Sequence, residues 1–293
     1  MNDGQRRGVA CAVLAAAFYA LNSPLSKLLL GDVAPTMMAA FLYLGAGLGM
    51  AALQWLRSRS GRAGREQRLT RRELPFTVGM VALDIAAPIA LMVGLSRTTA
   101  ANASLLNNFE IVATSLIALV CFGEAISRRL WAGIGLVTLS TALLSAQDAG
   151  SFSFSSGSVW VLIACVCWGF ENNCTRRLSA KDPVEIVVIK GIFSGLGSLC
   201  IALYVGEPLP AWLPALLALG LGFVAYGLSI ALYIYAQREL GAARTSAYYA
   251  VAPFIGAGLS LIIFREIPTP GFMAALALMI AGTWCVTCAQ GAA

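Results

Sequence analysis

The sequence predicts an all-α integral membrane protein whose ten transmembrane helices form two inverted repeats of five. Hydrophobic residues make up 59% of the 293 residues, charged residues only 12%, and the mean hydropathy is +0.79. An ordinary soluble domain is about one quarter charged. The chain holds ten apolar segments of about 20 residues, the length at which a helix crosses about 30 Å of hydrocarbon. Both halves of the chain also carry related motifs in the same order.

Short connections join the predicted spans, so we expect no separate soluble domain. The longest connection is the arginine-rich segment 58–73. Residues 1–150 are predicted to form the first five-helix repeat and residues 151–293 the second, and the two together form one domain. The predicted spans are 8–30, 34–57, 74–97, 101–122, 129–147, 157–178, 183–205, 211–237, 241–264 and 269–289.

The second half echoes the first at a shift of about 142 to 149 positions. At a shift of 148, Pro35 and Gly47 fall on Pro183 and Gly195. At a shift of 142, Ala100, Ala101, Ser104, Phe122 and Glu124 fall on Ala242, Ala243, Ser246, Phe264 and Glu266. Because each copy has an odd number of spans, the second copy must lie upside down in the membrane. Inverted repeats are the construction principle of many secondary transporters.

The net charge of +6 indicates a membrane topology and not a nucleic-acid partner. With both termini in the cytoplasm, 16 of the 20 Lys and Arg residues fall on the cytoplasmic side. Cytoplasmic loops of membrane proteins carry such an excess of basic residues. We therefore expect both termini to be cytoplasmic. The apolar spans are expected to be surrounded by membrane lipid.

Four charged residues lie inside predicted spans, where an unpaired charge costs several kcal/mol. They are Asp84, Glu110, Glu171 and Lys190. At 1.5 Å of rise per residue, Asp84 and Glu110 lie near the midplane. Glu171 and Lys190 lie at similar depths and could meet as an ion pair. None of the four has a charged counterpart in the other half, which favours a ligand or ion role. A purely structural Glu171–Lys190 pair is the alternative.

Amide and aromatic side chains gather at similar depths in several spans. Those expected to bind a substrate are Tyr19, Asn22, Asn102, Asn107, Asn108, Trp168, Tyr226 and Tyr249, together with Asp84, Glu171 and Lys190. Polar walls are required by a water-filled cavity within a membrane protein. Aromatic rings beside amides suit a solute with an apolar body and a polar head. Hydrogen bonds between helices are the alternative explanation.

Helix breakers and small residues indicate helices that bend and pack closely. Pro24, Pro88 and Pro253 are expected to interrupt spans 1, 3 and 9. Glycines in spans 2 and 7 form small-residue faces that allow close helix contact. These glycines are Gly45, Gly47, Gly49, Gly191, Gly195 and Gly197.

The sequence offers no catalytic constellation for a membrane-embedded enzyme, and no cofactor is expected. The chain has no histidine. Cys285 and Cys288 have the spacing of a redox or metal motif, but they lie within an apolar span, where cysteine is a small packing residue. An enzyme is thus a remote alternative. A receptor or channel is a further alternative, against which the inverted duplication argues.

The motifs around the fourth span of each half resemble the EamA type of the drug/metabolite transporter superfamily. The stretches that carry the resemblance are Thr99–Leu106, Glu110-Ile111 and Phe122-Gly123-Glu124 in the first half, and Gly241–Ala247, Pro253 and Phe264-Arg265-Glu266 in the second. Ile111 stands where the family usually has proline, and Arg265 where it usually has glycine. The resemblance implies a basket of helices around a central cavity, with spans 5 and 10 packed outside. Glu124 and Glu266 are interpreted as structural.

Within that superfamily, the chain looks most like the bacterial exporters of aromatic amino acids. The stretches Asn107–Glu110 and Trp168–Asn172 prompt this comparison. The resemblance implies a carrier in the bacterial inner membrane that exports small amphipathic metabolites by alternating access and that could act as a monomer. Multidrug or other metabolite efflux is the alternative.

The resemblance also suggests roles for the candidate residues. Asn102, Asn107 and Asn108 would bind the polar head of an amino acid-like substrate, and Lys190 could meet its carboxylate. The aromatic residues would contact the substrate side chain. Asp84 or Glu110 could carry a coupling proton, and facilitated diffusion is the alternative to coupling.

Overall fold

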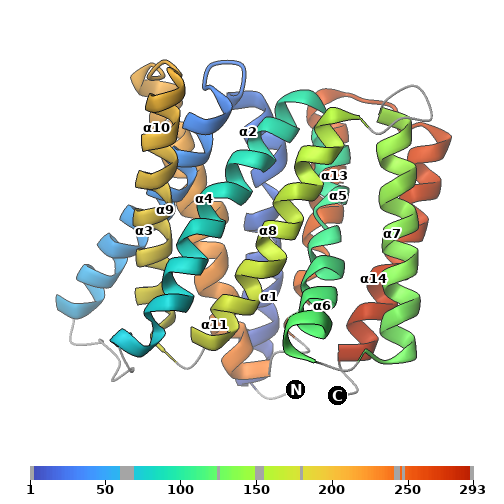
Figure 1. The fold of residues 1–293 in the computed structure, drawn as a ribbon, viewed down its shortest axis with the longest axis horizontal. Coiled ribbons are helices and arrows are strands. Elements are labelled where there is room, and N and C mark those ends of the chain that lie inside the picture. Colours follow the sequence, from blue (N-terminus) through green and yellow to red (C-terminus); the bar gives the residue numbers. More distant parts are fainter. Residues whose placement is uncertain are drawn as a thin grey trace.

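The computed structural model describes residues 3–59, 69–123, 126–148, 155–178, 181–240, 245 and 248–290. Within these residues the chain forms helices that follow the ten predicted spans (Figure 1). In order they are α1 (Asp3–Ala20) with α2 (Asn22–Leu29), α3 (Pro35–Arg59), α4 (Leu74–Arg97), α5 (Ala100–Leu106) with α6 (Phe109–Phe122), α7 (Arg128–Asp148), α8 (Ser156–Leu178), α9 (Pro183–Val205), α10 (Trp212–Gly222) with η2 (Phe223–Leu228) and α11 (Ser229–Leu240), α13 (Ala252–Phe264) and α14 (Pro270–Gln290). A short 3₁₀ turn, η1 (Arg71–Glu73), precedes α4. The prediction of an all-α membrane fold is confirmed.

Eight of the described helices are long and apolar enough to cross a membrane, and α13 is a shorter apolar helix. The remaining segment is α8, the sixth in chain order, which carries Glu171, Asn172 and Asn173 and has two arginines near its end that lower its mean hydropathy. A span of this kind is tolerated where its polar residues face the protein interior. Glu171 and Asn173 of α8 are indeed buried.

Three of the segments are interrupted near their middle. The first breaks at Leu21, three residues before Pro24, and the fourth breaks at Asn107–Asn108. The ninth begins its final helix at Ala252, with Pro253 in the first turn. The break in the fourth segment occurs although Ile111 replaces the usual proline. The predicted interruption at Pro88 is wrong, because α4 runs unbroken through this residue. A single proline removes one hydrogen bond, and the packed neighbours of α4 hold the helix together around it.

The helices pack as two bundles that combine segments from both halves of the chain. In one bundle, α1 packs on α11 and α13; in the other, α8 packs on α4 and α6. The bundles meet where α5 packs on α13 and where α2 packs on α4 and α5. These meeting elements lie in the half of the molecule opposite the N- and C-termini, which share one end (Figure 1). These contacts of α2, α5 and α13 join the bundles on the side away from the termini, and α3 also joins them because it packs on both α4 and η2.

Glycines allow α3 and α9 to cross at very short distance. A Cβ atom added to Gly47 would lie 2.5 Å from the backbone nitrogen of Ile192, and one added to Gly191 would lie 2.4 Å from the nitrogen of Gly47. Real side chains do not approach backbone so closely. The close helix contact predicted for the glycines of spans 2 and 7 is thus confirmed between α3 and α9, at Gly47 and Gly191.

The contact between α7 and α14 is reciprocal. A Cβ on Gly133 would meet Val286, and a Cβ on Gly282 would meet Val137. A shift of 149 positions carries Gly133 onto Gly282 and Val137 onto Val286. Each half thus offers the same glycine to the same valine of the other half. This is the pattern that a two-fold axis produces between identical subunits.

The helices that end the fourth segment of each half stop in the same way. Gly123 follows α6 with a φ of 66°, and Arg265 follows α13 with a φ of 53°. The left-handed conformation at this position is a common helix terminator and is normally occupied by glycine. Arg265 adopts it despite its side chain. Glu266 donates its backbone N–H to Leu261. Glu124 lies outside the described residues.

Candidate functional site

A lysine lies between two carboxylates in the interior of the protein. The Nζ atom of Lys190 on α9 is 3.1 Å from Oδ2 of Asp84 on α4 and 3.0 Å from Oε1 of Glu171 on α8. Asp84 is fully buried and the Glu171 side chain is only 3% exposed. The ion pair of Glu171 with Lys190 that the sequence predicts is therefore present, and Asp84 joins it. With all three groups ionised, this Asp84–Lys190–Glu171 cluster carries a net charge of −1.

Hydrogen bonds extend this cluster toward the other bundle. Tyr43 of α3 donates its hydroxyl proton to Oδ1 of Asp84 at 2.9 Å. Glu171 also accepts a hydrogen bond from Thr175, one turn further along α8. The ring of Tyr43 lies 5.2 Å from the ring of Tyr226. Tyr43 therefore connects the charged cluster to the aromatic residues of the opposite bundle.

Five tyrosines form a continuous series of ring contacts. After Tyr43 and Tyr226, the series continues through Tyr19, which lies 6.1 Å from Tyr226 and 5.7 Å from Tyr249. Tyr249 in turn lies 4.9 Å from Tyr233. We call this set the tyrosine cluster. Tilted and edge-on ring pairs at these distances are favourable, and each phenol also offers a polar hydroxyl.

Local backbone geometry places Tyr226 in this cluster. Tyr226 lies in η2, a π-helical turn between α10 and α11. Such turns occur mostly as single insertions in α-helices and are frequent at functional sites. The Tyr226 hydroxyl accepts a hydrogen bond from Asn22 Nδ2 at 2.9 Å, and Asn22 Oδ1 accepts one from Ser26 at 3.1 Å. The π-helical turn is thereby joined to the break between α1 and α2.

Glu110 lies apart from the Asp84–Lys190–Glu171 cluster. It occupies the first turn of α6, where a carboxylate is favoured by the helix dipole. Its Oε1 accepts a hydrogen bond of 2.7 Å from Asn172 Nδ2 on α8, and the same nitrogen lies 3.2 Å from the Thr114 hydroxyl. Glu110 is thus held by neutral partners, whereas Asp84 is held by a cation.

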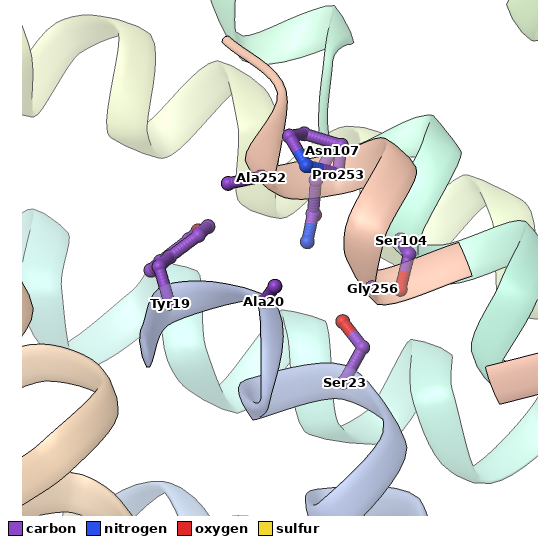
Figure 2. Close-up of a pocket in the computed structure, with 8 residues that line it drawn as sticks. All are labelled: Tyr19, Ala20, Ser23, Ser104, Asn107, Ala252, Pro253 and Gly256. Atoms are coloured by element: carbon purple, nitrogen blue, oxygen red, sulfur yellow. The ribbon is translucent and has the colours of Figure 1, made fainter. Parts of the chain in front are cut away.

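A small cavity lies where the broken helices meet. Its walls are Tyr19, Ala20, Ser23, Ser104, Asn107, Ala252, Pro253 and Gly256. Figure 2 shows the side chains of Ser23, Ser104 and Asn107 directed into the same space. The volume open to the centre of a water molecule is about 10 Å³, close to the least that holds one water. A larger solute would need the bundles to move apart.

The structure brings most of the residues predicted for substrate binding into two connected places. Tyr19, Asn22, Tyr226 and Tyr249 contact one another in or beside the tyrosine cluster, and Asp84, Glu171 and Lys190 form the charged cluster. Lys190 already pairs with two protein carboxylates in this structure. Its contact with a substrate carboxylate stays a prediction. Trp168 is buried in the same hydrophobic core as Tyr43 and Tyr226.

Only one of the three asparagines predicted to bind substrate in the fourth segment lines the cavity. Asn107 lines the cavity, whereas Asn102 and Asn108 are buried and are not part of its wall. In the described part of the chain, neither amide atom of Asn108 has a hydrogen-bond partner. The set predicted from the sequence omits Tyr43, Ser104, Asn172 and Tyr233. A polar residue in an apolar span is the signal for each, but it does not show which face of the helix the residue occupies. Ser246, the repeat counterpart of Ser104, lies outside the described residues.

Comparisons with known proteins agree with this architecture. The sequence model of the EamA-like transporter family matches residues 6–146 and again 155–288. An uncharacterized transporter of Methanothermobacter thermautotrophicus is 27% identical over 279 residues, covering 88% of this chain and 80% of the relative. The uncharacterized transporter YyaM of Bacillus subtilis is 21% identical over 188 residues, covering 61% of this chain and 60% of the relative. A solved crystal structure shares the fold with a TM-score of 0.68 at 18% identity, covering 98% of this chain and 96% of the other.

Proposed function

Because the chain belongs to the EamA-like transporter family, we propose that it exports small amphipathic metabolites, with aromatic and other neutral amino acids as the substrate class. The observation that carries this proposal is the position of the tyrosine cluster directly beside the polar cavity. Tyr19 belongs to both. Aromatic rings would hold an apolar side chain, and the cavity would receive a polar head. The likeness of Asn107–Glu110 and Trp168–Asn172 to the aromatic amino acid exporter YddG adds support.

The two-bundle packing supports alternating access as the mechanism. In the described state the bundles are held together on the side away from the termini by α2, α5 and α13. On α2, Lys27 donates hydrogen bonds to the backbone oxygens of Leu95 at 2.6 Å and Thr98 at 2.7 Å, at the end of α4. We propose that these contacts open when the bundles rock about the midplane, as in other carriers built from inverted repeats.

We further propose that both termini lie in the cytoplasm and that the membrane is the bacterial inner membrane. The excess of Lys and Arg in the loops on the terminal side supports this orientation. Each half of the chain would contribute to both bundles, so that residues 1–150 and 151–293 would act as one transport unit.

Proton coupling would involve the buried carboxyl groups. One proton would neutralise the net charge of the Asp84–Lys190–Glu171 cluster, and Glu110 could be protonated without breaking an ion pair. Uptake into proteoliposomes with and without a pH gradient, for the wild type, Asp84→Asn and Glu110→Gln, tests this step. Equal rates with and without the gradient in the wild type would exclude coupling and leave facilitated diffusion.

Counterflow in proteoliposomes tests the substrate class. Liposomes loaded with unlabelled substrate would receive labelled Trp, Phe, Thr, Met or a cationic dye in parallel. We expect saturable exchange of the amino acids, fastest for Trp and Phe because of the tyrosine cluster. Exchange of the dye alone would replace the amino acid proposal by drug efflux. Exchange that does not saturate would indicate a channel.

A further inference from the structure

The cavity between the broken helices contains buried polar atoms that lack a hydrogen-bond partner within the described part of the chain. The Ser104 hydroxyl and the Oδ1 atom of Asn107 have no hydrogen-bond partner among the residues that the structure describes, although the two residues are only 3% and 7% exposed. Buried polar groups in proteins are nearly always hydrogen-bonded, to protein, water or ligand. Figure 2 shows both side chains directed into the cavity, opposite Ser23. These atoms are therefore available to a bound polar group.

Helix ends of both signs meet at the same cavity. The helix α1 ends at Ala20 and α5 ends at Leu106, whereas α2 begins at Asn22 and α13 begins at Ala252. An N-terminal helix end carries about half a positive charge and a C-terminal end about half a negative charge. The C-terminal ends of α1 and α5 and the N-terminal ends of α2 and α13 thus adjoin a wall whose side chains carry no formal charge, and α6 begins at Phe109, two residues after Asn107.

We propose that this cavity, once enlarged by movement of the bundles apart, is the subsite for the zwitterionic head of an α-amino acid, an inference that rests on the proposed function. The carboxylate lies toward the N-terminal ends of α2 and α13, and the ammonium lies toward the C-terminal ends of α1 and α5. A solute with a single charge leaves the helix ends of one sign unmatched. The charge-free wall favours a head whose two charges cancel. The titratable residues Asp84, Glu110, Glu171 and Lys190 lie outside this wall.

The position of Tyr19 gives the substrate its direction. Tyr19 forms one wall of the cavity and is also in contact with Tyr226 and Tyr249. A head in the cavity therefore places the amino acid side chain against the tyrosine cluster. Gly256 lets the head approach α13, because a Cβ there would lie 3.0 Å from the Ser104 hydroxyl and 3.1 Å from the backbone oxygen of Ala20.

Three ligands that differ only in their charges test the subsite. L-Phenylalanine has both charges, 3-phenylpropanoate lacks the ammonium group, and phenethylamine lacks the carboxylate. We expect calorimetric titration of the purified wild type to show at least about tenfold weaker binding of each single-charge ligand, the loss that about 1.4 kcal/mol represents. Equal binding of phenylalanine and either analogue, or no binding of phenylalanine, overturns the proposal.

Two variants and a matched control test the location. Ser104→Ala and Asn107→Ala are expected to weaken phenylalanine binding about tenfold, the effect of losing one hydrogen bond to a charged group. Ser198→Ala on α9 is the control, because Ser198 is also buried and has no hydrogen-bond partner among the described residues, but does not line the cavity. Variants that bind phenylalanine as tightly as the control overturn the location.

Counterflow measured on the same proteins separates the two proposals. Amino acid exchange by a wild type whose Ser104→Ala and Asn107→Ala variants match the Ser198→Ala control would retain the proposed function and reject the subsite. Tight, two-charge-dependent binding of phenylalanine without exchange would retain the subsite and reject amino acid export. The three-ligand comparison needs no variant, so misfolding of Asn107→Ala would not affect it.

Discussion

The ammonium group of Lys190 lies 3.1 Å from the carboxylate of Asp84, a residue that is fully buried. This ion pair joins α9 to α4, and Glu171 extends it to α8. Removing one member of a buried ion pair leaves a charge without a partner in a medium of low dielectric constant. The cluster is therefore a determinant of folding as well as a candidate for proton coupling.

The variant Lys190→Met is expected to be destabilised, with a free energy of unfolding about 3 to 5 kcal/mol lower, because two carboxylates then lie close together without a cation. Thermal unfolding of the purified protein in detergent measures the loss. The variant with Asp84→Asn and Glu171→Gln added should recover much of it. Lys181→Met is the control, since Lys181 pairs with Glu73 at 3.5 Å near the helix ends. An equal loss in both lysine variants would contradict a special role of the buried cluster.

Substitution of Tyr43 by phenylalanine removes the hydroxyl that hydrogen-bonds Asp84 while keeping the ring beside Tyr226. We expect the free energy of unfolding to fall by about 1.5 to 3 kcal/mol, which is typical of the loss of a hydrogen bond to a charged group. The exposed Tyr235 provides the matched control as Tyr235→Phe. Denaturation curves for the two variants that coincide would show that the Tyr43 hydroxyl contributes nothing.

The crossing of α3 and α9 should tolerate no side chain at Gly47. The variant Gly47→Ala is expected to reduce the yield of folded protein strongly, because its methyl group would overlap backbone atoms of α9. Gly258→Ala in α13 has open space around the added atom and should stabilise the helix by up to about 1 kcal/mol. Size-exclusion profiles in detergent compare the two. Normal profiles for Gly47→Ala would mean that α3 and α9 can separate at little cost.

The end of α13 offers a stabilising substitution. Arg265 has a φ of 53°, a conformation that costs an L-residue with a side chain about 1 to 2 kcal/mol. Arg265→Gly is therefore expected to raise the unfolding temperature, and Gly123→Ala at the repeat-related end of α6 is expected to lower it. An unfolding temperature that falls in Arg265→Gly would show that the arginine side chain contributes more than its backbone conformation costs.

Loss of the Lys27 side chain should weaken the closure on the side away from the termini. In Lys27→Met the backbone oxygens of Leu95 and Thr98 lose a charged donor. We expect faster labelling of a cysteine at the Ser23 position by a membrane-impermeant maleimide added to that side, in a background without native cysteines. Lys27→Arg, which keeps the charge, is the control. Labelling rates that do not differ would place the closure elsewhere.

Much of the fold follows from the sequence because the lengths of apolar segments and the repeat pattern are local properties. The spans at 183–205 and 74–97 agree with α9 and α4 to the residue. The behaviour of prolines did not follow, since Pro88 is accommodated within α4 whereas the chain breaks near Pro24. Whether a helix bends at proline depends on its neighbours, which the sequence of one helix does not show.

For the candidate site, the sequence indicates which side chains are buried but not which of them meet. The pairing of Glu171 with Lys190 could be predicted, because both lie at one depth and have opposite charges. The part of Asp84 in the same cluster could not, because it depends on how α4 and α9 face each other. The π-helical turn at Tyr226 has no simple signal in the sequence, although it places the ring that joins Tyr43 to Tyr19 in the tyrosine cluster.

The reciprocal contact of Gly133 with Val286 and of Gly282 with Val137 has a consequence for how this protein can be assembled. Such a contact does not require a covalent link between its two sides, since two separate chains related by a two-fold axis would make it equally well. Co-expression of residues 1–150 and 151–293 as two polypeptides should therefore yield a heterodimer that co-purifies through a tag on one half. The single chain would then correspond to a dimer whose two halves are always made in equal amounts and inserted in opposite orientations.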